Sequence, residues 1–429
     1  MLTTAFSAAA LRNDALAQCG RYWPVGSEPV AALPMPAPAA LPQEVLPPRL
    51  VMVRLPEFAE DVGVAGALAV PQHYCPASGR WTDVDWLCVM GWFLHNLAER
   101  AHEDAHGPIH SYSFRLHGWD ERIWKHAWVN RAALFLRRWA AETAGRPEEE
   151  LLGPMPAAEI RLTHDVDAIR KTFAIRGKQS AFLLFNAARR ALHGRRREAL
   201  SCLRKALRFF FTPGDDWGFE RIARLDEAHG LTATFLFAGC PAPPPWKDFR
   251  RWLIDPQYDV AALAGRIAAL RHAGHRVGLH PSVAAWRDAD RLRATAERVA
   301  AAAGGPITVC RQHWLMFSFA RTWAAQQQAG ITEDCTLGFN DRSGFRNGAA
   351  LAFTPAGSFG SYRAWPLALM DSHLHDYATC PEAAQKTTLH ILKELWATGG
   401  QATILWHPHT ISNDYGWQTT YNFLLNRLQ

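Results

Sequence analysis

The segment IRLTHDVD, residues 160–167, is a short β-prone run that leads directly into two aspartates, Asp165 and Asp167. Because side chains alternate along an extended chain, the two carboxylates are expected to point the same way. Two carboxylates on one side can divide their roles: one binds a metal ion, and the other stays free as a base. The segment therefore predicts a strand whose carboxyl end carries a reactive centre.

Further β-prone runs follow this segment and alternate with helical segments. The runs cover residues 232–237, 276–279, 307–309 and 402–406. The helical segments cover residues 216–229, 259–273, 288–303, 318–329 and 382–398. Asp, Ser and Gly residues at their ends are typical start and stop signals of helices. This alternation predicts an α/β fold with a parallel sheet or barrel.

Polar residues follow three of the later runs at the point where each run ends. They are His280-Pro281-Ser282, Arg311-Gln312-His313-Trp314 and His407-Pro408-His409-Thr410. In α/β sheets and barrels the carboxyl ends of the strands converge on one face, which carries the active site. Four strand ends with Asp and His therefore predict a metal site of carboxylate and imidazole. A histidine at another strand end suits the protonation of a leaving amine.

The first part of the chain has a different character. Residues 29–56 are rich in proline and are expected to form an extended connector. Residues 83–104 and 120–144 are expected to form amphipathic helices. We place a domain boundary near residue 156. Residues 1–156 are then an N-terminal, mixed, helix-containing accessory domain, and residues 157–429 are the α/β domain.

A basic segment interrupts the alternation of strands and helices. Residues 170–208 contain twelve basic residues and one acidic residue, whereas the whole chain has a formal charge of +6. We predict a basic helical insert at about residues 170–211. Its arginine faces are either solvated, or they form an amphipathic surface that meets anionic lipid or a polyanionic glycan. No nucleic-acid-binding motif accompanies the segment, so nucleic acid is not an expected partner.

Composition and the remaining patterns exclude several classes of protein. The chain has 429 residues, of which 48% are hydrophobic and 20% are charged, which excludes disordered, collagenous and fibrous chains. Its eight cysteines form no CxxC pair, and Arg12 and Asp14 interrupt the apolar start that a secretory signal needs. We therefore expect a cytoplasmic protein, which is peripheral at the membrane if the basic insert meets lipid.

An ordered set of motifs resembles the bacterial polysaccharide deacetylases, the carbohydrate esterase family 4 type, in the branch with an N-terminal accessory region. The motifs are THDVD (163–167), GLHPS (278–282), RQHW (311–314), DCTLGFNDRSGFRNG (334–348) and ILWHP (404–408). The resemblance covers about residues 157–429. It implies a distorted (β/α)7 barrel and the metal-dependent removal of acetyl groups from N-acetylated sugars.

The resemblance also implies roles for single residues. The first aspartate of the opening motif, here Asp165, is the base, and the second, Asp167, binds the metal together with His280. Arg311 matches the arginine that orients the base. His407 matches the general acid of the closing motif. The family further has an aspartate near the orienting arginine, for which Asp371 is the candidate, and the expected cofactor is a divalent metal ion, with zinc as first choice.

The chain departs from the family at one metal ligand. A second histidine usually follows the first by four residues, but Ala284 occupies that position. His313 is the first candidate to replace it, followed by His409 and His164. If none does, either the metal affinity is weak or the protein is a non-catalytic glycan-binding or scaffold protein of polysaccharide assembly. A hydrolase of non-sugar amides on the same barrel is a further alternative.

Four residues near the motifs are candidates for binding an N-acetylated glycan or glycolipid substrate. Trp314 and Trp406 could stack on a sugar ring, although most tryptophans of the chain are expected to pack in cores. Arg346 could contact either a substrate acid or a structural carboxylate. His409 completes the set. A lipid-linked or nucleotide-linked precursor of a surface polysaccharide would fit a cytoplasmic enzyme.

Overall fold

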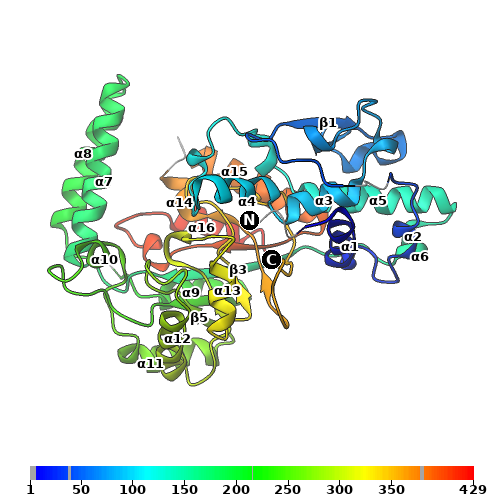
Figure 1. The fold of residues 1–429 in the computed structure, drawn as a ribbon. Coiled ribbons are helices and arrows are strands. Elements are labelled where there is room, and N and C mark those ends of the chain that lie inside the picture. Colours follow the sequence, from blue (N-terminus) through cyan, green and yellow to red (C-terminus); the bar gives the residue numbers. More distant parts are fainter. Residues whose placement is uncertain (1–5, 37–39, 215, 377–380) are drawn as a thin grey trace. The chain divides into compact units, whose positions relative to one another are not determined.

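The structure is a computed structural model that describes residues 6–36, 40–214, 216–376 and 381–429 (Figure 1). The chain folds into two compact units. The first unit comprises Met1–Arg161 and Trp314–Ile404, and the second comprises Leu162–His313 and Leu405–Gln429. The expected domain boundary near residue 156 stays a prediction.

The expected α/β fold is confirmed. In the described part of the chain, eight strands form one sheet in the order β8-β7-β6-β5-β4-β3-β10-β9, a curled parallel sheet of the distorted-barrel kind. The strands are β3 (Glu159–Val166), β4 (Ala233–Phe237), β5 (Arg276–Leu279), β6 (Val309–Cys310), β7 (Glu333–Asp334), β8 (Arg363–Ala364), β9 (Leu367–Met370) and β10 (Gln401–Leu405).

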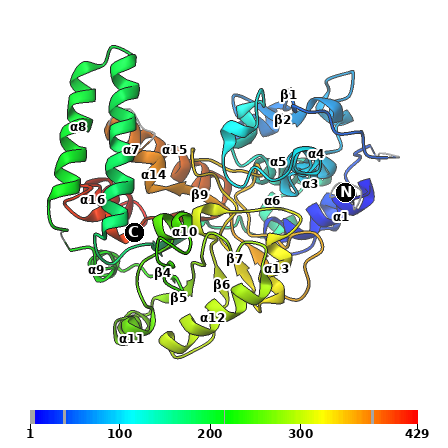
Figure 2. The same cartoon turned by 60° about the vertical axis from the view of Figure 1, so that its left-hand side comes forward.

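The strands of the second unit are aligned at their carboxyl ends. β3 and β4 pair in parallel with Val166 opposite Phe237, and β4 and β5 pair with Phe237 opposite Leu279. Every residue of β4 is buried, as expected for a parallel strand covered on both faces. Helices α11 (Ala264–His272) and α12 (Ala289–Ala303) pack beside β5 (Figure 2). This register brings the residues that follow β3 and β5 to the same edge of the sheet.

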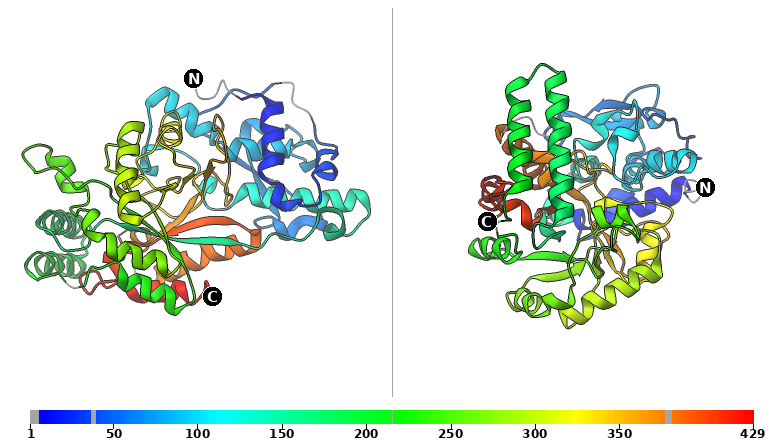
Figure 3. Two further views of the ribbon diagram at one scale, coloured as in Figure 1. Left: turned by 90° about the horizontal axis from the view of Figure 1, so that it is seen from below. Right: turned by 90° about the vertical axis from the view of Figure 1, so that its left-hand side faces the viewer.

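The basic segment forms a helical hairpin. α7 (Phe173–Leu192) and α8 (Arg196–Phe211) lie side by side, which Figures 1 and 3 both show. Two polar contacts join them near the base: Ser180 donates to the carbonyl of Ala206, and Arg176 donates to the carbonyl of Phe210. Along their length several large apolar side chains are exposed: Phe185, Leu192, Leu200 and Leu207 among them.

The N-terminal elements pack around one buried helix. α3 (Trp86–Leu94) is buried along its whole length and contacts α1 (Ala8–Gln18) and α5 (Trp128–Ala144). The prediction of a single amphipathic helix over residues 83–104 is wrong, because two helices cover this segment. The chain breaks at Asn96, which adopts a left-handed conformation with φ of 52°, before α4 (Leu97–His106) begins. Asparagine tolerates this conformation better than most residues do.

The remaining elements complete the two units. β1 (Leu50–Arg54) and β2 (Ala67–Pro71) form a small antiparallel sheet in the first unit. The other α-helices are α2 (Glu28–Ala31), α6 (Glu148–Leu152), α9 (Glu220–Ala228), α10 (Phe249–Ile254), α13 (Thr322–Gln328), α14 (Asp371–His375), α15 (Pro381–Thr398) and α16 (Gln418–Leu425). None of the helices in the described ranges has the length and apolar character that a bilayer crossing requires. Seven cysteines in these ranges carry free thiols, and Cys380 lies outside them.

Candidate metal and catalytic site

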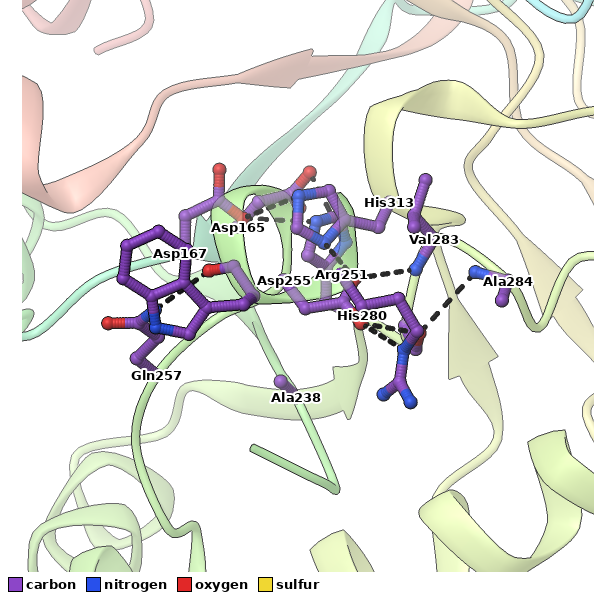
Figure 4. A network of polar contacts seen from close by, with 12 residues as sticks. Asp165, Asp167, Ala238, Arg251, Asp255, Gln257, His280, Val283, Ala284 and His313 are labelled. Atoms are coloured by element: carbon purple, nitrogen blue, oxygen red, sulfur yellow. Dashed lines mark hydrogen bonds and ion pairs between the residues drawn. The ribbon is translucent and has the colours of Figure 1, made fainter. Parts of the chain in front are cut away.

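Six of the predicted site residues come together in the second unit. Asp165 lies in β3 and Asp167 follows that strand directly. His280 follows β5, Arg311 and His313 follow β6, and His407 lies two residues beyond the end of β10. Figure 4 shows Asp165, Asp167, His280 and His313 facing one another. The polar residues that follow β3, β5, β6 and β10 therefore lie close together in the structure.

Three of the six form a cluster that could hold a metal ion. One donor atom each from Asp167, His280 and His313 lie within 4.8 Å of one another. The Nε2 atoms of His280 and His313 are 3.2 and 3.7 Å from Asp167 Oδ1. His407 Nε2 is 3.6 Å from the other carboxylate oxygen of Asp167. The donor set of one carboxylate and two imidazoles suits zinc and related divalent ions.

The hydrogen bonds around the cluster favour metal binding. His280 Nδ1 is 2.9 Å from the carbonyl oxygen of Arg311, so the Nδ1–H donates there and Nε2 presents its lone pair to the cluster. His313 is 1% exposed, and neither of its ring nitrogens has a hydrogen-bond partner among the described residues. Burying an unsatisfied imidazole costs free energy, and a bound cation would remove that cost. The residues present therefore fit a metal ion.

Electrostatics sets the protonation state of each donor in the cluster. Burial would raise the pKa of Asp167, but His313, His280 and His407 outweigh burial and hold that pKa well below its ordinary value. Burial lowers the pKa of His313 to about 4, and the carboxylate of Asp167 opposes this only in part. At neutral pH Asp167 and His313 are thus in the forms that bind a cation. Burial would lower the pKa of His280, but Asp165 and Asp167 outweigh burial and raise that pKa, so metal binding there has to displace a proton.

A second buried pair adjoins the cluster. Arg311 Nη1 donates to Asp165 Oδ1 at 2.9 Å, and the two side chains are 0% and 2% exposed. The other oxygen of Asp165 is 3.6 Å from His280 Nδ1. A charge-assisted hydrogen bond of this kind fixes the orientation of a carboxylate. Asp165 is thus held beside the metal cluster without being one of the three clustered donors.

Asp255 lies beside the site and was not among the residues predicted from the sequence. Its Oδ1 accepts from the backbone N–H of Val283 at 2.9 Å, and its Oδ2 accepts from Ser282 Oγ at 2.6 Å and Arg251 Nε at 2.8 Å. Oδ1 also lies 3.9 Å from His313 Nδ1. This distance is too long for a hydrogen bond, so Asp255 acts on His313 through its charge, which partly opposes the lowering of the His313 pKa by burial. Asp255 follows α10 and not a strand, so it is not among the polar residues at strand ends.

A pocket opens beside Asp167. It is lined by Asp167 and Ala168 after β3, by Ala174, Ile175 and Lys178 of α7, by Trp252, Leu253, Ile254, Asp255 and Gln257, and by His409 and Tyr415. His409 therefore lies where a substrate-binding residue is expected. Its ring stacks on Trp217 with the centroids 5.3 Å apart. Lys178 is the second residue of this site that the sequence analysis missed, because it comes from the insert.

Two other candidates of the second unit take part in packing. Trp406 is fully buried and its ring lies against Tyr421, with the centroids 4.9 Å apart. This position favours the packing alternative for Trp406 over stacking on a sugar. His164 points away from the aspartates on β3 and is held by the carbonyl of Trp406 at 2.8 Å and by Asp226 Oδ2 at 2.9 Å. These bonds favour a structural role for His164.

Two further candidates, Trp314 and Asp371, belong to the first compact unit. Trp314 has a left-handed φ of 55° and is 37% exposed, and its carbonyl accepts from Ser111 and Asn340. Asp371 begins α14 and is fully buried, and its Oδ1 accepts from the N–H of Ser372. Their roles in sugar binding and in orienting the base stay predictions.

Arg346, also in the first unit, contacts a structural carboxylate. Its Nη2 and Nε donate to the two oxygens of Glu99 at 2.5 and 3.2 Å, and both side chains are at least 95% buried. Its Nη1 donates to the carbonyl of Gly338 at 2.8 Å. Of the two alternatives for Arg346, the structure thus favours the structural carboxylate over a substrate acid.

Replacing Arg346 by Met should lower the free energy of unfolding by about 3–5 kcal/mol, because Glu99 would keep a buried charge without its partner. Urea unfolding measures this. Arg342→Met is the matched control, since Arg342 pairs with the exposed Glu121 at 3.4 Å and such pairs contribute about 0–1 kcal/mol. Unchanged stability of Arg346→Met together with weaker glycan binding would contradict the structural role.

Comparisons with known proteins gave similar solved structures only. No family model and no curated protein matches the chain. Among solved structures, the chain is similar to a Mycobacterium smegmatis protein described as a polysaccharide deacetylase, with 17% identity, 64% of this chain and 85% of that chain covered, and a TM-score of 0.40. It is also similar to a polysaccharide deacetylase from Bacillus cereus, with 14% identity, 63% of this chain and 87% of that chain covered, and a TM-score of 0.31. A third similar structure is a CE4-family pseudoenzyme from Bacillus anthracis, with 11% identity, 63% of this chain and 62% of that chain covered, and a TM-score of 0.30.

Proposed function

We propose that the protein is a metal-dependent deacetylase that hydrolyses the N-acetyl group of an amino sugar in a polysaccharide or its precursor. The observation that carries this proposal is that an oriented carboxylate and a group of metal-ligand side chains lie next to each other. A carboxylate oriented by Arg311 lies beside a cluster of one aspartate and two histidines. Hydrolysis of an unactivated amide needs both a positioned base and an electrophile, and this arrangement offers a place for each.

The residues of the site have separate roles in the proposed reaction. Asp167, His280 and His313 would hold a divalent cation, with zinc as the expected ion. The cation would polarise the acetyl carbonyl and lower the pKa of a nearby water. Asp165 accepts the proton of the attacking water, and Arg311 keeps the carboxylate of Asp165 in the orientation that this transfer requires.

The second proton transfer is assigned to His407. The departing sugar amine needs a proton as the carbon–nitrogen bond breaks, and an imidazole can donate it near neutral pH. His407 is 17% exposed, more than His280 or His313, so a substrate can reach it. The products are acetate and a free amino sugar.

The proposal predicts acetate release that depends on metal. Purified protein is loaded with zinc, its metal content is measured, and acetate is followed during incubation with N-acetylated oligosaccharides. We expect about one bound metal per chain and activity that a chelator removes and zinc restores. Chelated protein that releases acetate as fast as loaded protein would contradict the metal dependence.

The same experiment addresses the second candidate function. Ala284 stands where the family usually has a metal ligand, and this residue motivates a glycan-binding or scaffold protein without catalysis. Glycan binding without bound metal or acetate release would favour that function. Acetate release from simple acetamides but not from sugars would favour a hydrolase of non-sugar amides. The cytoplasmic location and the contact of the insert with an anionic membrane stay predictions from the sequence.

A further inference from the structure

The basic insert forms one wall of the pocket beside Asp167. Ala174, Ile175 and Lys178 line the pocket, and all three belong to α7. They occupy positions i, i+1 and i+4, so that Ala174 and Lys178 share one face of the helix. The insert that interrupts the regular order of strands and helices is therefore part of the candidate active site.

The base of the insert is firmly anchored to the rest of the second unit. Lys171 Nζ is 2.7 Å from Asp414 Oδ1, and these side chains are 1% and 8% exposed. The indole N–H of Trp217 donates to the other oxygen of Asp414 at 2.8 Å. Arg176 adds two hydrogen bonds of 2.7 Å to backbone carbonyls at the end of α8. The first turns of α7, which carry Lys178, are thus held in a defined position.

The pocket combines an apolar wall with one cationic side chain. Trp252, Leu253 and Ile254 supply apolar surface, and an indole face suits packing against a sugar ring. Burial lowers the pKa of Lys178, and the nearby carboxylate of Asp167 partly opposes this. An ammonium group in such a wall offers an anion a charge-assisted hydrogen bond.

We propose that this pocket binds an anionic substituent of the substrate and that Lys178 determines this specificity. The substrate class is then an N-acetylated amino sugar that carries a phosphate or a carboxylate group. This inference rests on the deacetylase function proposed above. A phosphate would belong to an activated or lipid-linked precursor, and a carboxylate would belong to an acidic glycan.

Binding of three small sugars tests the proposal without the need for turnover. N-acetylglucosamine 1-phosphate is the phosphate probe, N-acetylmuramic acid is the carboxylate probe, and N-acetylglucosamine is the neutral reference. Calorimetry is run on metal-free and zinc-loaded protein at low salt. We expect at least one anionic sugar to bind about 10- to 100-fold more tightly than the neutral sugar, as one charged hydrogen bond allows.

Variants assign this preference to one side chain. Lys178→Met should remove the preference and leave the affinity for N-acetylglucosamine within about twofold, and Lys178→Arg should keep most of it because the charge is retained. Lys205→Met is the matched control, since Lys205 is exposed on α8 outside the pocket lining. Lys205→Met should bind all three sugars as the unmodified protein does.

Two outcomes would overturn the inference. One is equal affinity of the unmodified protein for charged and neutral sugars. The other is a Lys178→Met variant that loses zinc and weakens all three sugars equally, because Lys178 would then act only through Asp167. Failure of the proposed function looks different: selective anion binding without acetate release contradicts the deacetylase, whereas acetate release from neutral glycans without anion preference contradicts only the role of Lys178.

Discussion

Replacing Asp165 by Asn should lower the turnover number about 10²- to 10⁴-fold while the protein keeps its metal. The amide is the same size and can still accept the hydrogen bond that Arg311 donates at 2.9 Å, but it cannot take a proton from water. General base catalysis contributes a factor of this size in enzymes. The experiment measures acetate release at saturating substrate together with metal content.

The control for this variant is Asp290→Asn, which makes the same chemical change at a carboxylate that is 92% exposed on α12. It should leave both turnover and metal content unchanged. Full activity of Asp165→Asn would show that the base is another residue. Loss of metal from Asp165→Asn would show that Asp165 is a ligand and not a free base.

Replacing His313 by Ala or Gln should lower the affinity for zinc at least about 100-fold. The cluster has three donor residues, and even groups behind the ligands change metal affinity 10- to 100-fold. Competition with a chelating dye measures the affinity directly. Since a ligand that binds only the folded state raises stability by about 2.7 kcal/mol at 100 times its Kd, zinc should also stabilise the unmodified protein more than the variant.

Two variants make the His313 result interpretable. Gln retains a polar side chain and Ala does not, so a shared loss of affinity reports on the imidazole and not on a local packing defect. His272→Ala is the control, because His272 is an exposed histidine on α11. Unchanged zinc affinity in both His313 variants would contradict the assignment of His313 as a metal ligand. His313 would then not replace the histidine that the family usually has at the position of Ala284.

The arrangement of the candidate site follows largely from local sequence patterns. Alternation along β3 places Asp165 and Asp167 on one side and His164 on the other, and the structure shows this arrangement. Parallel pairing brings the residues that follow β3 and β5 to one edge, so His280 could be located from the end of its strand. His313 could be named as a ligand candidate for the same reason.

Other assignments needed contacts that no local pattern contains. Trp406 and Arg346 lie in conspicuous motifs, yet Trp406 packs on Tyr421 and Arg346 pairs with Glu99, 247 residues away in the chain. The prediction of a single helix over residues 83–104 is wrong because the spacing of hydrophobic residues does not reveal that Asn96 adopts a left-handed conformation. Partners of this kind depend on which surfaces meet after the chain folds.

Sequence patterns predict the α/β fold and the strand ends that carry Asp165, Asp167, His280, Arg311 and His407, and the ordered motifs carry the resemblance to polysaccharide deacetylases. These features rest on periodicity and chain order, which are properties of neighbouring residues. The folded chain is needed to see that Asp255 lies near His313 and that Lys178 lines the pocket beside Asp167. Both residues come from helical segments and not from strand ends, and they reach the site because α7 and α10, which contact each other, both line this pocket.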